Sequence, residues 1–141
     1  MRRNSQAGSA LIEFAGSLIL LSSLFTGIFQ VGYTFFSYER LENSVRAAAR
    51  YASLHAAGSA NVPDEALVQT VRNLAVYDDP TPAAGAKPLV TGLATANIDV
   101  LVTGKTATVS VRGFTLDSLF SKVKLDGRPT VTFPITRGEA Q

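Results

Sequence analysis

Apolar side chains follow one another without a charge over a long stretch near the N-terminus. The 25 residues from Phe14 to Tyr38 contain no charged side chain and are rich in Leu, Ile and Phe. At 1.5 Å per residue a helix of this length extends for about 37 Å, which is enough for a hydrocarbon core of about 30 Å. The pattern therefore predicts a membrane-spanning helix.

Beyond Tyr38 the pattern becomes that of an amphipathic helix. The stretch SYERLENSVRAAARYASLHAA has no Gly or Pro before Gly58 and is rich in residues that favour helices. Glu42 and Arg46 form a favourable pair at i and i+4. The sequence predicts one helix from about Ser9 to Ala57, about 70 Å long. Its apolar positions recur at helical spacing: Leu41, Val45, Ala48, Ala52, and then His55 or Ala56.

A second, shorter helix is predicted after the break at residues 58–63. Pro63 suits the first turn of a helix, and the acidic side chains of Asp64 and Glu65 favour its N-terminus. The turn-rich stretch DDPTPAAGAKP predicts that this helix ends near Tyr77. Its residues form one apolar stripe: Leu67, Val68, Val71, Leu74 and Ala75.

The remainder of the chain has the period of two that is typical of strands. Gly104-Lys105 predicts a tight hairpin between two strands, and TVTFPIT predicts a third. Pro134 cannot donate to a ladder, so the third strand is expected at an edge. LDSLF, residues 116–120, is expected to form a single helical turn. The expected inward positions are Ile98, Val100 and Val102, then Ala107, Val109 and Val111, then Val131, Phe133 and Ile135.

Together these elements predict an α+β fold. A long N-terminal helix, membrane-spanning in its first half and amphipathic in its second, is expected to pack on a small antiparallel sheet of about three strands, with a second short helix. The apolar face of the three strands must be covered by a helix. The sequence therefore predicts that the outer half of the long helix covers the sheet.

Charge and composition narrow the function. The chain has 13 basic and 11 acidic residues, and leaving out Arg2 and Arg3 makes the balance 11 to 11, so no nucleic-acid surface is indicated. The two arginines before the apolar run place the N-terminus in the cytoplasm by the positive-inside rule. A secretory signal peptide is the alternative, but its apolar region spans only 7–15 residues and precedes a small-x-small cleavage site. This run is longer, and no such site follows closely.

The residue inventory gives no support for an enzyme, a metal site or a cofactor. There is no cysteine, which excludes disulfides, thiol catalysis and cysteine metal sites. His55 is the only histidine, so no histidine cluster can bind a metal. Asp78 and Asp79 precede Pro80 and are expected to be turn residues.

One carboxylate, Glu13, lies near the start of the apolar run, and its spacing from Gly8 resembles a known motif. A short basic leader, Gly8, four mostly apolar residues and Glu13 resemble the processing signal of type IV pilin-like proteins. Glu13 followed by Phe14 is similar to the tight-adherence (Tad/Flp) branch. GIFQVGYTFF and RAAARYAS are similar to TadE-like minor pilins, or pseudopilins. Two positions depart from that pattern: Ile19 replaces a frequent proline, and Gln30 replaces a frequent acid.

The resemblance implies processing by a prepilin peptidase between Gly8 and Ser9. The new amine of Ser9 would lie one turn from the Glu13 carboxylate, on the same helix face. In a bundle of parallel helices, that carboxylate could pair with the Ser9 amine of a neighbour, with Phe14 beside it as a second assembly residue. An alternative is a Glu13 that merely rests in the headgroup layer.

Small residues in the run offer places for helix packing in the membrane. Ser23 and Gly27, like Ser22 and Thr26, have the small-xxx-small spacing that allows helices to approach closely. Gly32 is either a packing notch or a site of local helix melting.

The resemblance also implies an organisation and a set of partners. Residues 1–8 would be a leader, 9–38 a transmembrane assembly helix and 39–141 an extracytoplasmic domain. The protein would be a non-enzymatic minor pilin that helps to assemble or initiate a Tad pilus, located in the inner membrane or in surface pili. Its partners would be the prepilin peptidase, the major and minor pilins, the inner-membrane assembly platform and lipid. The alternative is an uncleaved, membrane-anchored accessory protein of the Tad secretion apparatus whose outer domain binds a partner protein.

Overall fold

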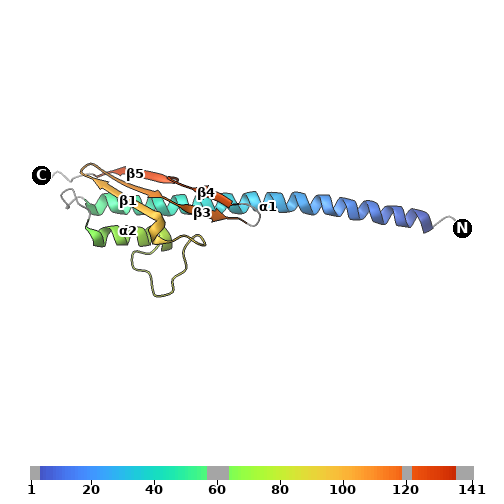
Figure 1. The fold of residues 1–141 in the computed structure, drawn as a ribbon, viewed down its shortest axis with the longest axis horizontal. Helices are drawn as coiled ribbons and strands as arrows, with labels where there is room; N and C mark the ends of the chain where they lie inside the picture. Colours follow the sequence, from blue (N-terminus) through green and yellow to red (C-terminus); the bar gives the residue numbers. More distant parts are fainter. Residues whose placement is uncertain (1–3, 57–63, 119–121, 136–141) are drawn as a thin grey trace.

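One helix organises the whole molecule. In the computed structural model, which describes residues 4–56, 64–118 and 122–135, helix α1 (Asn4–His55) runs unbroken for 52 residues. Its N-terminal half projects away from the other elements, which gather around its C-terminal half (Figure 1). The remaining elements are α2 (Glu65–Tyr77), the 3-10 helix η2 (Thr95–Asn97), β1 (Ile98–Thr103), β2 (Thr106–Val111), β3 (Phe114–Asp117), β4 (Lys122–Leu125) and β5 (Thr130–Pro134).

The long helix predicted from the sequence is confirmed, with a different start. It begins at Asn4, five residues before the expected Ser9, because a glycine such as Gly8 weakens a helix by only about 1 kcal/mol and does not stop it. It continues through Ile19, where a proline would remove a backbone hydrogen bond and bend the helix. It ends at His55, and the expected last residue, Ala57, lies outside the described residues.

The outer half of α1 is the centre of the core, because the helix contacts α2, β2 and β5. The predicted stripe is buried throughout, with Ala56 and not His55 as its last member. Ala49, outside that stripe, is buried as well, since more than one layer covers the helix. Ser44 and Ser53 are also buried and donate to the carbonyls of Leu41 and Arg50, so their hydroxyls need no other partner.

The second helix is confirmed, and side chains and backbone fix its two ends. The Asp64 carboxylate accepts a hydrogen bond from the backbone N–H of Ala66, which caps the N-terminus. Asp78 adopts a left-handed conformation (φ 59°), and its N–H donates to the carbonyl of Leu74. Val71 and Ala75 of the predicted stripe are buried. Pro63, expected in the first turn, lies outside the described residues.

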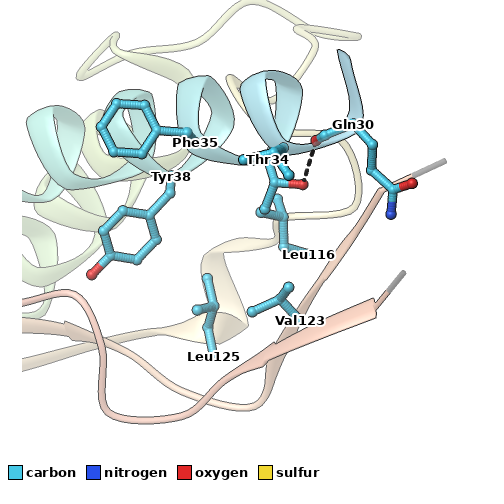
Figure 2. A pocket seen from close by; sticks show the side chains of 8 residues that line it. Gln30, Thr34, Phe35, Tyr38, Leu116, Val123 and Leu125 are labelled. Atoms are coloured by element: carbon cyan, nitrogen blue, oxygen red, sulfur yellow. Dashed lines mark hydrogen bonds between the residues drawn. The ribbon is translucent and has the colours of Figure 1, made fainter. Parts of the chain in front are cut away.

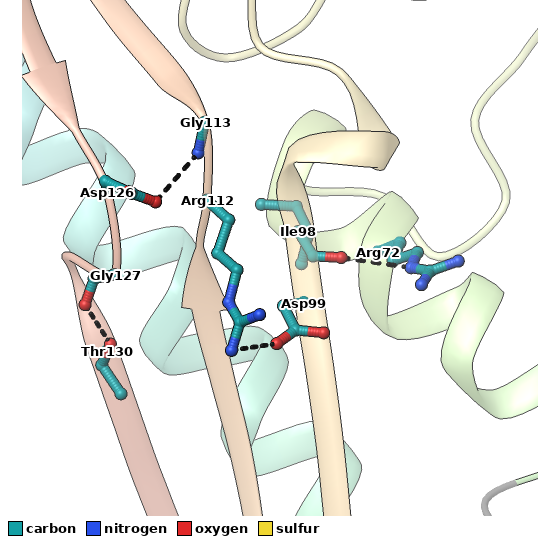
Figure 3. Close-up of polar contacts among 8 residues, drawn as sticks. All are labelled: Arg72, Ile98, Asp99, Arg112, Gly113, Asp126, Gly127 and Thr130. Atoms are coloured by element: carbon teal, nitrogen blue, oxygen red, sulfur yellow. Dashed lines mark hydrogen bonds and ion pairs between the residues drawn. The ribbon is translucent and has the colours of Figure 1, made fainter.

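A three-stranded antiparallel sheet in the order β1-β2-β5 confirms the predicted strands. Thr103 pairs with Thr106 across the expected hairpin, and Pro134 lies on edge strand β5 opposite Thr106. Figure 3 shows Arg112 in an ion pair with Asp99, 3.1 Å between nitrogen and oxygen. It also shows Arg72 of α2 donating to the Ile98 carbonyl, which ties α2 to the first strand.

The helical turn expected at residues 116–120 is wrong. Leu116 and Asp117 belong to β3, which pairs with β4 in a separate two-stranded sheet, and residues 119–120 lie outside the described part. Phe114 and Leu116 are buried and alternate with exposed Thr115 and Asp117, so the segment has the period of a strand. Pairing with Leu125 and Val123 gives this hairpin one apolar face.

Candidate assembly surface along the first half of α1

The first half of α1 exposes an apolar surface that water does not favour. All residues from 8 to 29 are exposed, and the helix is long and apolar enough to cross a membrane. Its exposed large apolar side chains in this part are Leu11, Ile12, Phe14, Leu18, Ile19, Leu20, Leu21, Leu24, Phe25, Ile28 and Phe29. A surface of this size needs to be covered by lipid or by other apolar helices.

The residues expected to carry processing and assembly lie at the N-terminal end of this surface. Gly8, Ser9, Glu13 and Phe14 are all helical and exposed. Ser9 and Glu13 are four residues apart, so both lie on one face of the helix. Apart from its chain neighbours and the nearby backbone of its own helix, a Cβ added at Gly8 would meet no atom within 4 Å among the described residues.

Two of the small residues, Ser23 and Gly27, line a shallow notch farther along the helix. Ser23 donates to the carbonyl of Leu20, and Thr26 to that of Ser22. Hydroxyls satisfied within their own helix can face lipid or another helix at little cost. The notch has a volume of about 610 Å³ and is lined by Ser23, Leu24, Gly27, Ile28 and Val31. Gly32 is helical and has open space around it.

A groove lies between α1 and the β3–β4 hairpin (Figure 2). Its volume is about 570 Å³, and its lining is mostly apolar, with Val31 shared between notch and groove. The Thr34 hydroxyl donates to the Gln30 carbonyl and lies 3.0 Å from the hydroxyl of Ser118. The groove residues are Gln30, Val31, Thr34, Phe35, Tyr38, Leu116, Val123 and Leu125.

The groove was missed by the sequence reasoning because the β3–β4 hairpin was missed. The signal was present as alternation: Phe114 and Leu116 on one strand, Val123 and Leu125 on the next. The groove extends along α1 to Gln30, and Thr34 contacts Ser118, directly after β3, so the packed domain overlaps part of the range 9–38.

Asp79 and His55 make local contacts within their own turn or helix. Asp79 accepts a hydrogen bond from the backbone N–H of Thr81, as a turn residue does. The His55 ring stacks on Tyr51, with ring centroids 3.9 Å apart, and its Nδ1 lies 2.9 Å from the Tyr51 carbonyl oxygen. Within the three described ranges, no group of three or more His, Asp or Glu side chains could hold a metal ion.

The comparison with protein families decides what this helix is similar to. Residues 8–50 match the TadE-like protein family. The match covers the apolar half of α1, including Glu13, and most of the amphipathic half, and it confirms the resemblance to TadE-like proteins. No curated protein and no solved structure matches the chain.

The match suggests a protein associated with the Tad pilus. The TadE-like family is non-enzymatic in general, and it implies partners among the pilus proteins. The long apolar helix and the family match together fit membrane anchoring.

Proposed function

We propose that this chain is a minor pilin-like subunit, cleaved by a prepilin peptidase after Gly8, that helps to assemble or initiate a Tad pilus through its apolar helix. The observation that carries the proposal is the exposed apolar half of α1 with Gly8 and Glu13 at its N-terminal end, inside the TadE-like match. The protein acts by packing against other subunits, not by catalysis.

The membrane part of α1 is proposed to end near Phe29. From Ser9 to Phe29 the helix is exposed and about 31 Å long, which matches a hydrocarbon core of about 30 Å. Gln30 is the first partly buried residue, and from there the β3–β4 hairpin covers one side of the helix. Arg2 and Arg3 keep the N-terminus in the cytoplasm, so the domain faces away from it.

Glu13 gives the helices a reason to assemble in register. An unpaired charge in hydrocarbon costs several kcal/mol. After cleavage the Ser9 amine of one subunit and the Glu13 carboxylate of a neighbour remove that cost for each other. Packing out of register leaves both charges unpaired, so the pair selects the in-register arrangement over others.

The proposed partners follow from these steps. The prepilin peptidase would act at Gly8, where the glycine leaves the scissile bond unhindered. The major pilin and other minor pilins would pack on the apolar half and its notch, and the inner-membrane assembly platform would receive the cleaved subunit. The alternative function is an uncleaved accessory protein, which the continuous helix from Asn4 through Gly8 favours.

Processing and location together test the proposal. The protein is expressed in its native host and in a strain without the prepilin peptidase, and its intact mass is measured in membranes and in sheared pili. We expect a mature N-terminus at Ser9, loss of cleavage in the peptidase-deficient strain, and mature protein in the pilus fraction or bound to pilins. Full-length protein in a host with active peptidase and intact pili would favour the accessory protein.

A matched pair of variants sharpens this test. Gly8→Leu is expected to block cleavage, because a bulky side chain obstructs the scissile bond. Gly16→Leu, in the same helix and equally free of neighbours, should be cleaved normally. Normal cleavage of both variants would show that Gly8 is not the processing site.

A further inference from the structure

A second groove lies on the outer half of α1, beyond the part proposed to cross the membrane. Its volume is about 550 Å³. Helix α2 and strand β5 form its sides through Leu74 and Phe133. We call it the arginine groove, and its residues are Asn43, Arg46, Ala47, Arg50, Tyr51, Leu54, Leu74 and Phe133.

Lipid does not account for this apolar surface. Leu54 is 61% exposed and lies 25 residues beyond Phe29, roughly 37 Å farther along the helix axis. Leu101 on β1 is 59% exposed, but it does not line the groove. Leu54, in contrast, shares one surface with partly buried Tyr51, Leu74 and Phe133. A contiguous apolar patch in water marks a site of protein interaction.

The charges of the groove define its partner. Arg46, Arg50 and Leu54 are spaced four residues apart and therefore follow one line along α1. The Arg46 guanidinium already binds a carboxylate, that of Glu42, at 2.7 Å. In the described part of the chain, Arg50 one turn farther on has no ion pair. The groove thus presents a cationic group next to an apolar depression.

We propose that the arginine groove binds an amphipathic helix of a second pilin-like subunit. The partner helix would place an Asp or Glu against Arg50 and, one turn away, a leucine or aromatic side chain against Leu54. This inference rests on the proposed function, because it assumes that the chain assembles with other pilins. It adds a contact between extracytoplasmic domains to the contacts between membrane helices.

Single cysteines test the contact without a known partner, because the chain contains no cysteine. Leu54→Cys and the control Leu101→Cys are expressed in the native host, and labelling by a membrane-impermeant maleimide is compared between the membrane pool and sheared pili. Because an interface core excludes water, we expect the thiol of Leu54→Cys to react about tenfold more slowly in pili than in membranes. The thiol of Leu101→Cys should react equally in both.

The outcomes separate the inference from the proposed function. A Leu54→Cys thiol that stays reactive in assembled protein overturns the inference and leaves the proposed function intact. Protection of the same thiol already in the unassembled protein also overturns it, because the chain itself would then cover the groove. If neither variant is found in the pilus fraction or bound to pilins, both proposals are contradicted.

Charge variants test the part assigned to Arg50. Arg50→Glu is expected to lower incorporation into pili about tenfold by placing like charges together, while Arg50→Lys retains most of it. Lys105→Glu, a charge reversal at another exposed position, on the β1–β2 hairpin, is the control and should have no effect. Equal thermal unfolding of the three variants excludes misfolding as the cause. Normal incorporation of Arg50→Glu would overturn the charge match.

Discussion

At the scale of single residues, a substitution of Glu13 tests the proposed assembly mechanism most directly. It stands among exposed apolar side chains on α1, four residues after Ser9. A carboxylate in this place either has a partner in the bundle or rests in the headgroup layer. The two interpretations differ in what happens when the charge is removed.

Glu13→Gln is expected to leave membrane insertion and cleavage intact and to abolish assembly. The amide has the size of the carboxylate, but the amine of the neighbouring Ser9 loses its counter-charge in a medium of low dielectric constant, at a cost of a few kcal/mol. The measurement compares processed protein in membranes with protein in sheared pili. Glu39→Gln, the next carboxylate along the helix, is the control.

Normal incorporation of Glu13→Gln would support the headgroup interpretation instead. Loss of cleavage alone would mean that the peptidase reads the carboxylate. Each result therefore assigns Glu13 a different role.

At the scale of elements, the buried face of α1 could be predicted from the sequence and the β3–β4 hairpin could not. The positions Leu41, Val45, Ala48 and Ala52 could be predicted because apolar residues at helical spacing indicate a buried face directly. The β3–β4 hairpin could not, because each strand has only four residues and a short apolar run fits a helical turn equally well. The groove at Gln30 could not be predicted either, because one of its two sides is formed by this hairpin.

Ala48→Leu tests the close approach of the layers around α1. Ala48 is fully buried, so the larger side chain forces the neighbouring elements apart, and we expect a loss of about 1–3 kcal/mol in the free energy of unfolding. Ala66→Leu on the exposed face of α2 is the control and should change stability little. Thermal and denaturant unfolding in detergent measure both. Equal stability of the two variants would show that the core around Ala48 has room to spare.

At the scale of the whole molecule, the chain divides at Gln30 into an exposed rod and a packed domain that share one helix. The domain depends on that helix, since Leu41 and Val45 are fully buried between the other elements. The arginine groove could not be predicted from the sequence, because its prediction requires the relative placement of three elements. Its residues come from α1, α2 and β5, and no spacing in the sequence joins them.

Two fragments test this division. Residues 30–141 are expected to form a soluble monomer that unfolds cooperatively, because they retain the helix that covers the sheet. Residues 63–141 lack it and should aggregate through the uncovered apolar face. Size-exclusion chromatography and thermal unfolding distinguish the two. A monomeric, cooperatively unfolding 63–141 fragment would show that α2 alone covers the sheet.

Because α1 is one unbroken helix, the directions in which side chains point at its two ends are fixed relative to each other. Glu13, Gly27 and the buried Val45 fall within about 40° of one another around the axis at 100° per residue. Leu54 lies 27 residues after Gly27, or about 7.5 turns, which places it on the opposite side. The two proposed contacts, on these two sides, would therefore reach different neighbours. Heterologous contacts build a ring or an open polymer, whereas a single self-complementary face closes into a pair.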